Sequence, residues 1–174
     1  MSRAERREVG VVVERQAVDN PWADHRWRVT GLLPGPAQAP PWTLLDEGPG
    51  VQRYFAGNAE LDLFPLETDT LKSNLEGPRP AVYVFLRASD AAPGIALHGA
   101  TVCAGEAEAH ADTGGDLVEA VPMPPGIRDW VADFVARHHV ERPVYRRKRD
   151  RAGGERGTNS GGETNSGGRT HGGG

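Results

Sequence analysis

The chain has 174 residues and one cysteine, Cys103. It therefore cannot form an internal disulfide, and a hydrophobic core must stabilise the fold. The hydrophobic share of 37% and the charged share of 25% are those of one globular domain with a tail. No apolar run approaches the roughly 20 residues that a membrane-spanning helix needs, and the N-terminal apolar run is too short for a signal peptide. We therefore expect a cytoplasmic protein without membrane contact.

The formal net charge of −4 conceals an asymmetry along the chain. Residues 9–140 contain 9 basic and 18 acidic side chains, whereas residues 141–151 contain 6 basic and 2 acidic ones. The basic run consists of Arg146, Arg147, Lys148 and Arg149. Such a run binds nucleic acid or an acidic protein surface. Because nucleic-acid binding also requires a basic face or exposed aromatic residues, the acidic body favours a protein partner.

The N-terminal half of the chain predicts a series of short strands. Residues 9–14 form a continuous β-branched run, which indicates a buried strand. Residues 25–33 alternate, with Trp27 and Val29 on one face and Arg26 and Arg28 on the other. A proline-rich loop over residues 34–41 follows. Further strands are expected over residues 42–45, 51–56 and 61–66, the last two joined by a turn at Gly57 and Asn58.

The C-terminal half mixes strands with helices. Residues 67–76 fit a short helix or an irregular crossover. The strongest strand signal lies at residues 81–87, and residues 95–103 and 116–121 are expected to be further strands. Alanine and glutamate favour a shorter helix at about residues 104–113. Apolar residues recur with helical spacing from Ile127 to His138, which predicts a long amphipathic helix at about residues 124–139.

Together these elements predict an α+β fold, with a mostly antiparallel β-sheet or a partly open barrel covered by the C-terminal helix. We expect a flexible N-terminus over residues 1–8, a single domain over residues 9–145, and a basic, then Gly-rich, disordered tail over residues 146–174. The sequence TNSGG occurs twice in this tail, which contains almost no apolar side chain. Nothing in it can offset the entropy lost on ordering.

Sequence motifs for catalysis are missing. There is no GxxxxGK[ST] phosphate loop, no GxGxxG, no HExxH and no GxSxG. A single cysteine also excludes zinc and iron–sulfur sites built from CxxC pairs. The sequence therefore favours a protein without catalytic residues, bound metal or cofactor.

The segment from Asp19 to Arg28 is the most unusual part of the sequence, because it combines two tryptophans with several charged residues at the start of a strand. Tryptophan and arginine are the residue types that anchor protein interfaces. We predict an interaction surface formed by Trp22, Asp24, His25, Arg26 and Arg28. In the alternative interpretation, both tryptophans belong to the core and the charges are merely solvated.

His138 and His139 end the predicted C-terminal helix and are added to this candidate surface. Neighbouring helical residues point about 100° apart, so the two imidazoles cannot easily chelate one ion. They would join Asp24 and His25 in a metal site only if the fold brought them close. Histidine at a helix C-terminus also stabilises the helix dipole, and this simpler role is favoured. His98 and His110 each stand alone in the sequence and are interpreted as structural.

Four segments together resemble a known family. They are VGVVVERQAVDNPWADHRWRV at residues 9–29, AVYVFLR at 81–87, DLVEAVPMP at 116–124 and FVARHHVERPVYRRKR at 134–149. In order and spacing they are similar to domain-of-unknown-function family 3305, a bacterial family of small proteins. The resemblance covers about residues 8–149, and DNPWADHRW and ARHHV are its most specific parts.

The resemblance implies a connection with molybdenum- or tungsten-dependent formate dehydrogenases, because genes of this family lie beside theirs, often with a second small uncharacterised protein. It favours a non-enzymatic accessory, assembly or maturation protein that binds a formate dehydrogenase subunit or that second protein. The alternative is a role in molybdenum-cofactor handling with a bound pterin or nucleotide, since some members are labelled molybdopterin-guanine dinucleotide biosynthesis protein A. The chain has no glycine cradle of the kind that such a nucleotidyltransferase uses.

Overall fold

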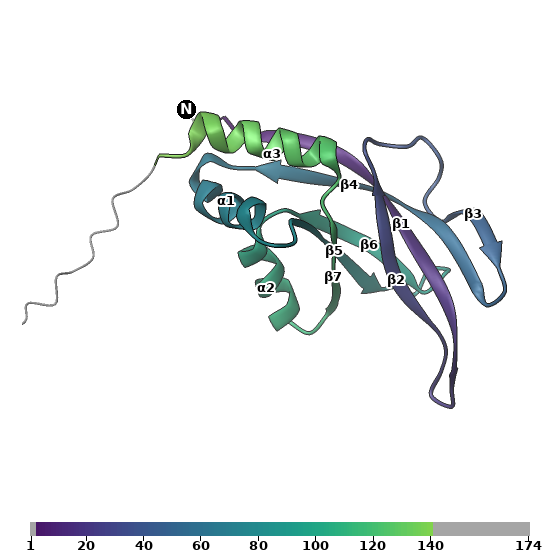
Figure 1. Cartoon of the computed structure of the whole chain (residues 1–174). Coiled ribbons are helices and arrows are strands. Elements are labelled where there is room, and N and C mark those ends of the chain that lie inside the picture. Colours follow the sequence, from purple (N-terminus) through teal and green to yellow (C-terminus); the bar gives the residue numbers. More distant parts are fainter. Residues whose placement is uncertain (1–2, 141–174) are drawn as a thin grey trace, which may run out of the picture. The chain divides into compact units, whose positions relative to one another are not determined.

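The computed structural model of the chain describes residues 3–140 (Figure 1). Seven antiparallel strands form two sheets in this part of the chain. Sheet A has the order β2-β1-β4-β3, and its strands are β1 (Glu5–Asn20), β2 (Ala23–Leu33), β3 (Thr43–Gly48) and β4 (Val51–Leu63). Sheet B has the order β6-β5-β7, and its strands are β5 (Ala81–Ala88), β6 (Ile95–Thr101) and β7 (Asp116–Pro122). The helical elements are η1 (Pro65–Glu67), α1 (Thr68–Glu76), α2 (Ala104–Asp112) and α3 (Pro125–His138).

The predicted α+β class with mostly antiparallel strands is confirmed, but the sheets do not close into a barrel. They meet at two places instead, where β6 contacts β4 and where β7 contacts β2. Valine-rich stretches of both sheets form the shared core, including Val11 and Val13 of β1 and Val82 and Val84 of β5. Burial of these side chains supplies the main driving force for folding.

Strand β1 is longer than the sequence pattern predicts. Glu5 pairs with Leu63 and Glu8 pairs with Glu60, so residues 5–8 belong to the ladder between β1 and β4. The flexible N-terminus expected over residues 1–8 is therefore wrong for this part. The charged residues at positions 5–8 show no apolar strand pattern, so the sequence did not predict a strand there. Backbone pairing with a neighbouring strand can nevertheless include residues whose side chains lie in solvent.

Strand β4 also corrects a prediction. The turn expected at Gly57 and Asn58 does not exist, because β4 runs unbroken through both residues and stays paired with β1. Gly57 has a φ of 135°, and the register between β1 and β4 shifts beside it. Such a conformation is accessible to glycine and marks a bulge within a strand. Glycine before asparagine therefore indicated an irregular backbone here, not a chain reversal.

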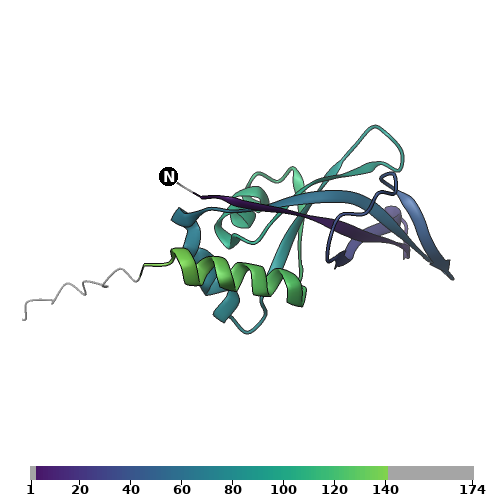
Figure 2. The same cartoon turned by 90° about the horizontal axis from the view of Figure 1, so that it is seen from above.

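Helix α3 contributes most of the helical residues of the core, which Leu71 of α1 also joins. Its fourteen residues make it close to average length for a globular protein. The buried residues Ile127, Trp130, Val131, Phe134 and Val135 form one face of it. The indole of Trp130 donates a hydrogen bond to Glu5 at 3.2 Å, and Arg137 contacts the same carboxylate at 2.6 Å. Helix α3 therefore lies along the first residues of β1 (Figure 2).

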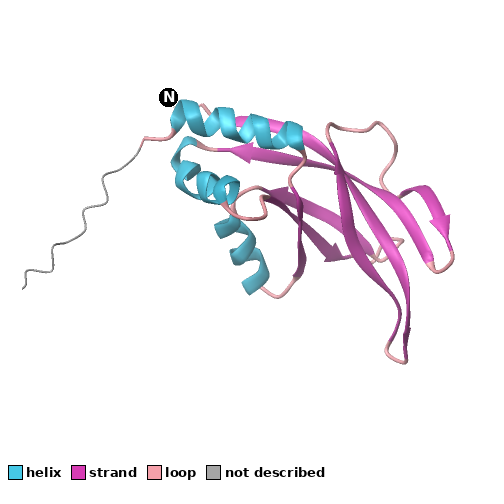
Figure 3. Cartoon of the chain, viewed as in Figure 1, coloured by secondary structure: helices cyan, strands magenta, loops and turns pink. Residues whose placement is uncertain are grey.

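The helices gather at one end of the described domain, and the paired strands β1–β2 and β3–β4 extend at the other (Figure 3). The buried stretch of β1 ends at Val13, and residues 14–20 are half-exposed or exposed. Sheet A thus continues beyond the core as an arm, which is four-stranded as far as Gln16 of β1 and is formed by β1 and β2 alone from there to their connecting turn. Within residues 3–140, every helix is too short or too polar to cross a lipid bilayer. The expected domain end at residue 145 and the expected tail lie outside the described residues.

Candidate functional site

Trp22 lies at the tip of the arm, in the turn that connects β1 to β2, and is 90% exposed. Its backbone N–H donates a 2.9 Å hydrogen bond to the side-chain oxygen of Asn20. This is the local turn chemistry for which asparagine is favoured. The alternative that placed Trp22 in the core is therefore wrong. A fully exposed tryptophan is uncommon, because its ring leaves a large apolar area in contact with water.

The alternation predicted for residues 25–33 is present from His25 to Thr30 and is broken by a register shift with β1 at residues 29–31. The candidate residues of β2 therefore divide between its two faces. Arg26 donates a 2.9 Å hydrogen bond to Gln16. Arg28 lies 2.9 Å from Glu119 of β7, and this carboxylate also accepts a short hydrogen bond from the backbone N–H of Val29. Arg28 thus connects the two sheets, which is a structural role.

The opposite face of the arm carries a cluster that we call the aromatic face: Arg15, His25, Trp27, Trp42 and Tyr54. Trp27 is at its centre, with ring centroids 5.6 Å from His25, 5.4 Å from Trp42 and 6.0 Å from Tyr54. The guanidinium of Arg15 lies 5.9 Å from the Trp27 ring and 3.3 Å from His25 Nδ1. All five side chains are half-buried. They form a preorganised surface of the composition that protein interfaces favour.

Trp42 reaches this cluster from an unusual backbone conformation. Its φ is 65°, in the left-handed region, and no other non-glycine residue of the described chain has a positive φ. Its N–H donates a 2.6 Å hydrogen bond to the carbonyl of Phe55, and its ring lies 6.1 Å from Tyr54. A bulky residue pays of order 1–3 kcal/mol for such a conformation, and strain of this kind concentrates at functional positions.

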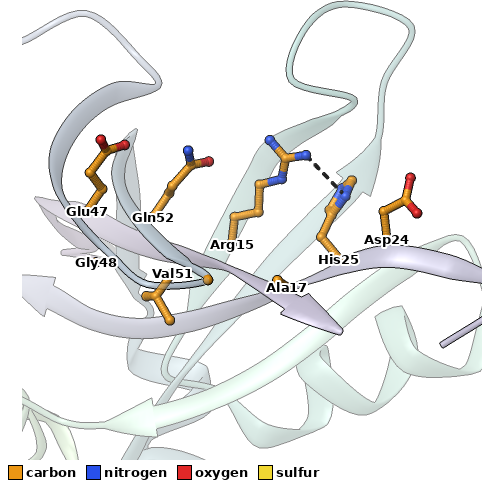
Figure 4. A pocket seen from close by; sticks show the side chains of 9 residues that line it. Arg15, Ala17, Asp24, His25, Glu47, Gly48, Val51 and Gln52 are labelled. Carbon is orange, nitrogen blue, oxygen red and sulfur yellow. Dashed lines mark hydrogen bonds between the residues drawn. The ribbon is translucent and has the colours of Figure 1, made fainter. Parts of the chain in front are cut away.

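An open groove of about 380 Å³ lies next to the aromatic face (Figure 4). Figure 4 shows Glu47, Gln52, Arg15, His25 and Asp24 in a row, with their side chains on the same side of the arm. Gly48, Gly50, Val51 and Ala17 complete the lining. The groove therefore offers one fixed cation, two carboxylates, an amide and an imidazole to a partner.

His138 and His139 lie far from this groove. Because α3 ends beside Glu5 and His25 pairs with Ala17, about 12 residues of β1 separate them, which is about 40 Å of strand. His139 contacts Thr68 at 3.3 Å and Asp69 at 3.4 Å, so it attaches the end of α3 to α1. The metal site that would have joined these histidines to Asp24 and His25 does not form. Arg146, Arg147, Lys148 and Arg149 lie outside the described residues.

A second polar cluster lies on sheet B. His98 of β6 and His110 of α2, which stand alone in the sequence, have ring centroids 5.9 Å apart. Asp116, the first residue of β7, lies 2.9 Å from His110 Nδ1 and accepts a 2.7 Å hydrogen bond from Arg87 Nε. The hydrogen bonds from Arg87 and then from His110 lower the pKa of the Asp116 carboxyl to about 2.

Sequence reasoning missed the partners in both clusters. Arg15 and Tyr54 join His25 and Trp27 through strand pairing, in which Arg15 lies opposite Trp27 and Tyr54 opposite Val13. Trp42 joins them from the turn before β3, where its N–H donates to the Phe55 carbonyl. The alternation in residues 14–16 and 51–54 was a usable signal, because it assigns side chains to faces. It did not reveal which strands are neighbours.

Comparison with known proteins gives one match. The family model described as Protein of unknown function (DUF3305) matches residues 8–149. No curated protein and no solved structure matches the chain. Since the family model covers well over half of the 174 residues, the chain belongs to the DUF3305 family of proteins of unknown function.

Proposed function

We propose that this chain is a non-enzymatic, cytoplasmic accessory protein that acts in the assembly or maturation of a molybdenum- or tungsten-dependent formate dehydrogenase by binding one of its subunits. Its docking surface comprises Trp22 and the aromatic face. The class of partner is proposed from the family resemblance, and a second small accessory protein encoded nearby is the other protein partner that this resemblance suggests.

The observation that carries a binding role is the exposed indole of Trp22 at the tip of the arm. The half-buried aromatic face and the arginine over Trp27 lie on the same arm. Interfaces concentrate their binding energy in a few tryptophan, tyrosine and arginine anchors. Strand pairing already fixes the positions of Arg15, Trp27 and Tyr54, so these anchors lose little conformational entropy when a partner binds.

The groove next to the aromatic face provides the observation behind a second candidate, which is the binding of a pterin or guanine nucleotide in molybdenum-cofactor handling. Its volume of about 380 Å³ is within the range of small-molecule sites. Asp24 and Glu47 nevertheless line it beside a single arginine. Two carboxylates repel the phosphates of a nucleotide, so this candidate is second to protein binding. Nucleic-acid binding through residues 142–151 rests on residues outside the described part.

The test is affinity purification of the tagged full chain from its host, grown with formate and molybdate, followed by mass spectrometry. We expect a formate dehydrogenase subunit among the recovered proteins. Trp22→Ala should lower its recovery at least about tenfold, since loss of an interface anchor costs about 2 kcal/mol or more. Leu66→Ala is the matched control, because Leu66 is 89% exposed but belongs to η1 at the other end of the domain.

Equal losses for both variants, or no loss for Trp22→Ala, would remove the arm as the docking surface. Recovery of the chain without a formate dehydrogenase subunit would count against the proposed partner. Calorimetric titration with GTP then tests the second candidate, with Arg15→Gln as the variant that should abolish any heat of binding.

A further inference from the structure

The cluster on sheet B has the composition of a metal site. We propose that His98, His110 and Asp116 bind one divalent transition-metal ion, with Zn²⁺ the best fit. One ligand atom from each residue lies within 4.8 Å of the others. The three residues come from β6, α2 and β7, so the fold and not the sequence spacing creates the cluster. This site is separate from the proposed docking surface on the arm.

The donor set consists of two imidazole nitrogens and one carboxylate oxygen, which is a frequent set for zinc sites that keep an open position. Bonds of about 2.0–2.2 Å in tetrahedral geometry place the ligand atoms about 3.4 Å apart. His110 Nδ1 and Asp116 Oδ2 are 2.9 Å apart and need to separate only slightly. His98 is exposed on the edge strand β6, so its side chain can rotate to complete the set.

Neighbouring residues hold two of these ligands in place. The His110 ring stacks on Phe85, with ring centroids 4.0 Å apart and an interplanar angle of 18°. Arg87 holds Asp116 through two hydrogen bonds. Arg87 Nε lies 2.7 Å from Asp116 Oδ1, and Arg87 Nη2 lies 3.3 Å from Asp116 Oδ2. Outer contacts of this kind orient ligands before the metal arrives. Arg87 also brings a positive charge, so we expect weaker binding than at a site with no cation nearby.

The cavity in front of the two histidines is acidic. It has a volume of about 410 Å³ and is lined by His98, His110 and the carboxylates of Glu60, Asp62 and Glu106. Arg6 pairs with Glu60 and Asp62 and neutralises part of this charge. Glu106 accepts a hydrogen bond from Thr101 at 2.8 Å and remains close enough to Glu67 to affect its ionisation. A predominantly acidic cavity raises the local concentration of cations.

The experiment uses the full chain purified without a histidine tag and stripped with a chelator. Zn²⁺ is titrated by calorimetry, and Co²⁺ is titrated in parallel and followed by its visible absorption, which reports coordination by nitrogen and oxygen ligands. We expect one equivalent of each metal to bind. Loss of a residue that only supports a metal ligand typically lowers metal affinity roughly 10–100-fold. His98→Gln and Asp116→Asn remove ligands themselves, so each should reduce the affinity by more than this.

The matched control is His139→Gln, because His139 and Asp69 form another histidine–carboxylate pair, 3.4 Å apart, away from the cavity. The control should retain wild-type affinity. Because His98 is exposed, His98→Gln should leave the fold intact. Its effect on metal affinity can therefore be measured even if Asp116→Asn impairs folding. Absence of binding by the wild-type chain, or binding that His98→Gln leaves unchanged, would overturn the proposal.

Discussion

Arg28 Nε lies 2.9 Å from Glu119 Oε1, and this ion pair joins strand β2 of sheet A to strand β7 of sheet B. Glu119 is the better shielded partner, and it also accepts the hydrogen bond of the buried Val29 N–H. The carboxylate therefore satisfies two donors, whereas the half-exposed guanidinium has solvent as an alternative.

This asymmetry predicts unequal effects of the two truncations. Glu119→Ala should lower the free energy of unfolding by about 1–3 kcal/mol, because it leaves a buried N–H without its partner. Arg28→Ala should cost less than about 1 kcal/mol, as is typical of a solvent-exposed ion pair. Urea denaturation of both variants measures the difference. Equal costs would mean that the contact between Glu119 and Val29 contributes nothing.

The raised pKa of Glu67 leads us to expect that stability depends on pH. Burial, followed by the charges of Glu106 and Asp62, raises the pKa of Glu67 above 4.5. A carboxyl with a raised folded-state pKa binds its proton more tightly in the folded state, so its ionisation at neutral pH destabilises the fold. Glu67→Gln should therefore stabilise the protein at pH 7, by less than about 1 kcal/mol for this partly exposed group.

The gain should disappear as the pH falls through the folded-state pKa of Glu67 towards 4.5, where the wild-type carboxyl becomes protonated as well. Thermal unfolding at a series of pH values checks this. Glu108→Gln, at an exposed position on α2, measures the general benefit of removing one negative charge from an acidic domain. A gain at Glu67 no larger than that at Glu108 would contradict the interpretation.

The positive φ of Gly57 leads us to expect that a side chain at this position strains the backbone. With φ at 135°, an alanine at this position is strained, although its Cβ would meet Leu97 only at an ordinary 3.5 Å. Gly57→Ala should destabilise the protein by about 1–3 kcal/mol. Gly31 in β2 is the matched control, because it has an ordinary φ and open space where a Cβ would lie. Gly31→Ala should be neutral or stabilise by up to about 1 kcal/mol. Chemical denaturation that ranks the two variants in the opposite order would exclude strain at Gly57.

The sequence by itself determined the features that depend on local preference. Alternation marked the two faces of β2, and the helical spacing of Ile127, Trp130 and Phe134 marked the buried face of α3. These patterns are readable because a side chain's direction follows from its own strand or helix. The four quoted segments, and not these patterns, carry the resemblance to the family that the comparison confirms.

The tertiary structure alone decided which segments are neighbours. It extended β1 to Glu5, carried β4 through Gly57, joined Trp42 and Tyr54 to Trp27, and brought His98 and His110 to Asp116. Strand pairing and register depend on contacts between residues far apart in the chain. The local preference of a residue for strand or helix does not determine these contacts. Both candidate sites consist of such contacts, and so the residues that complete them became visible only in the folded chain.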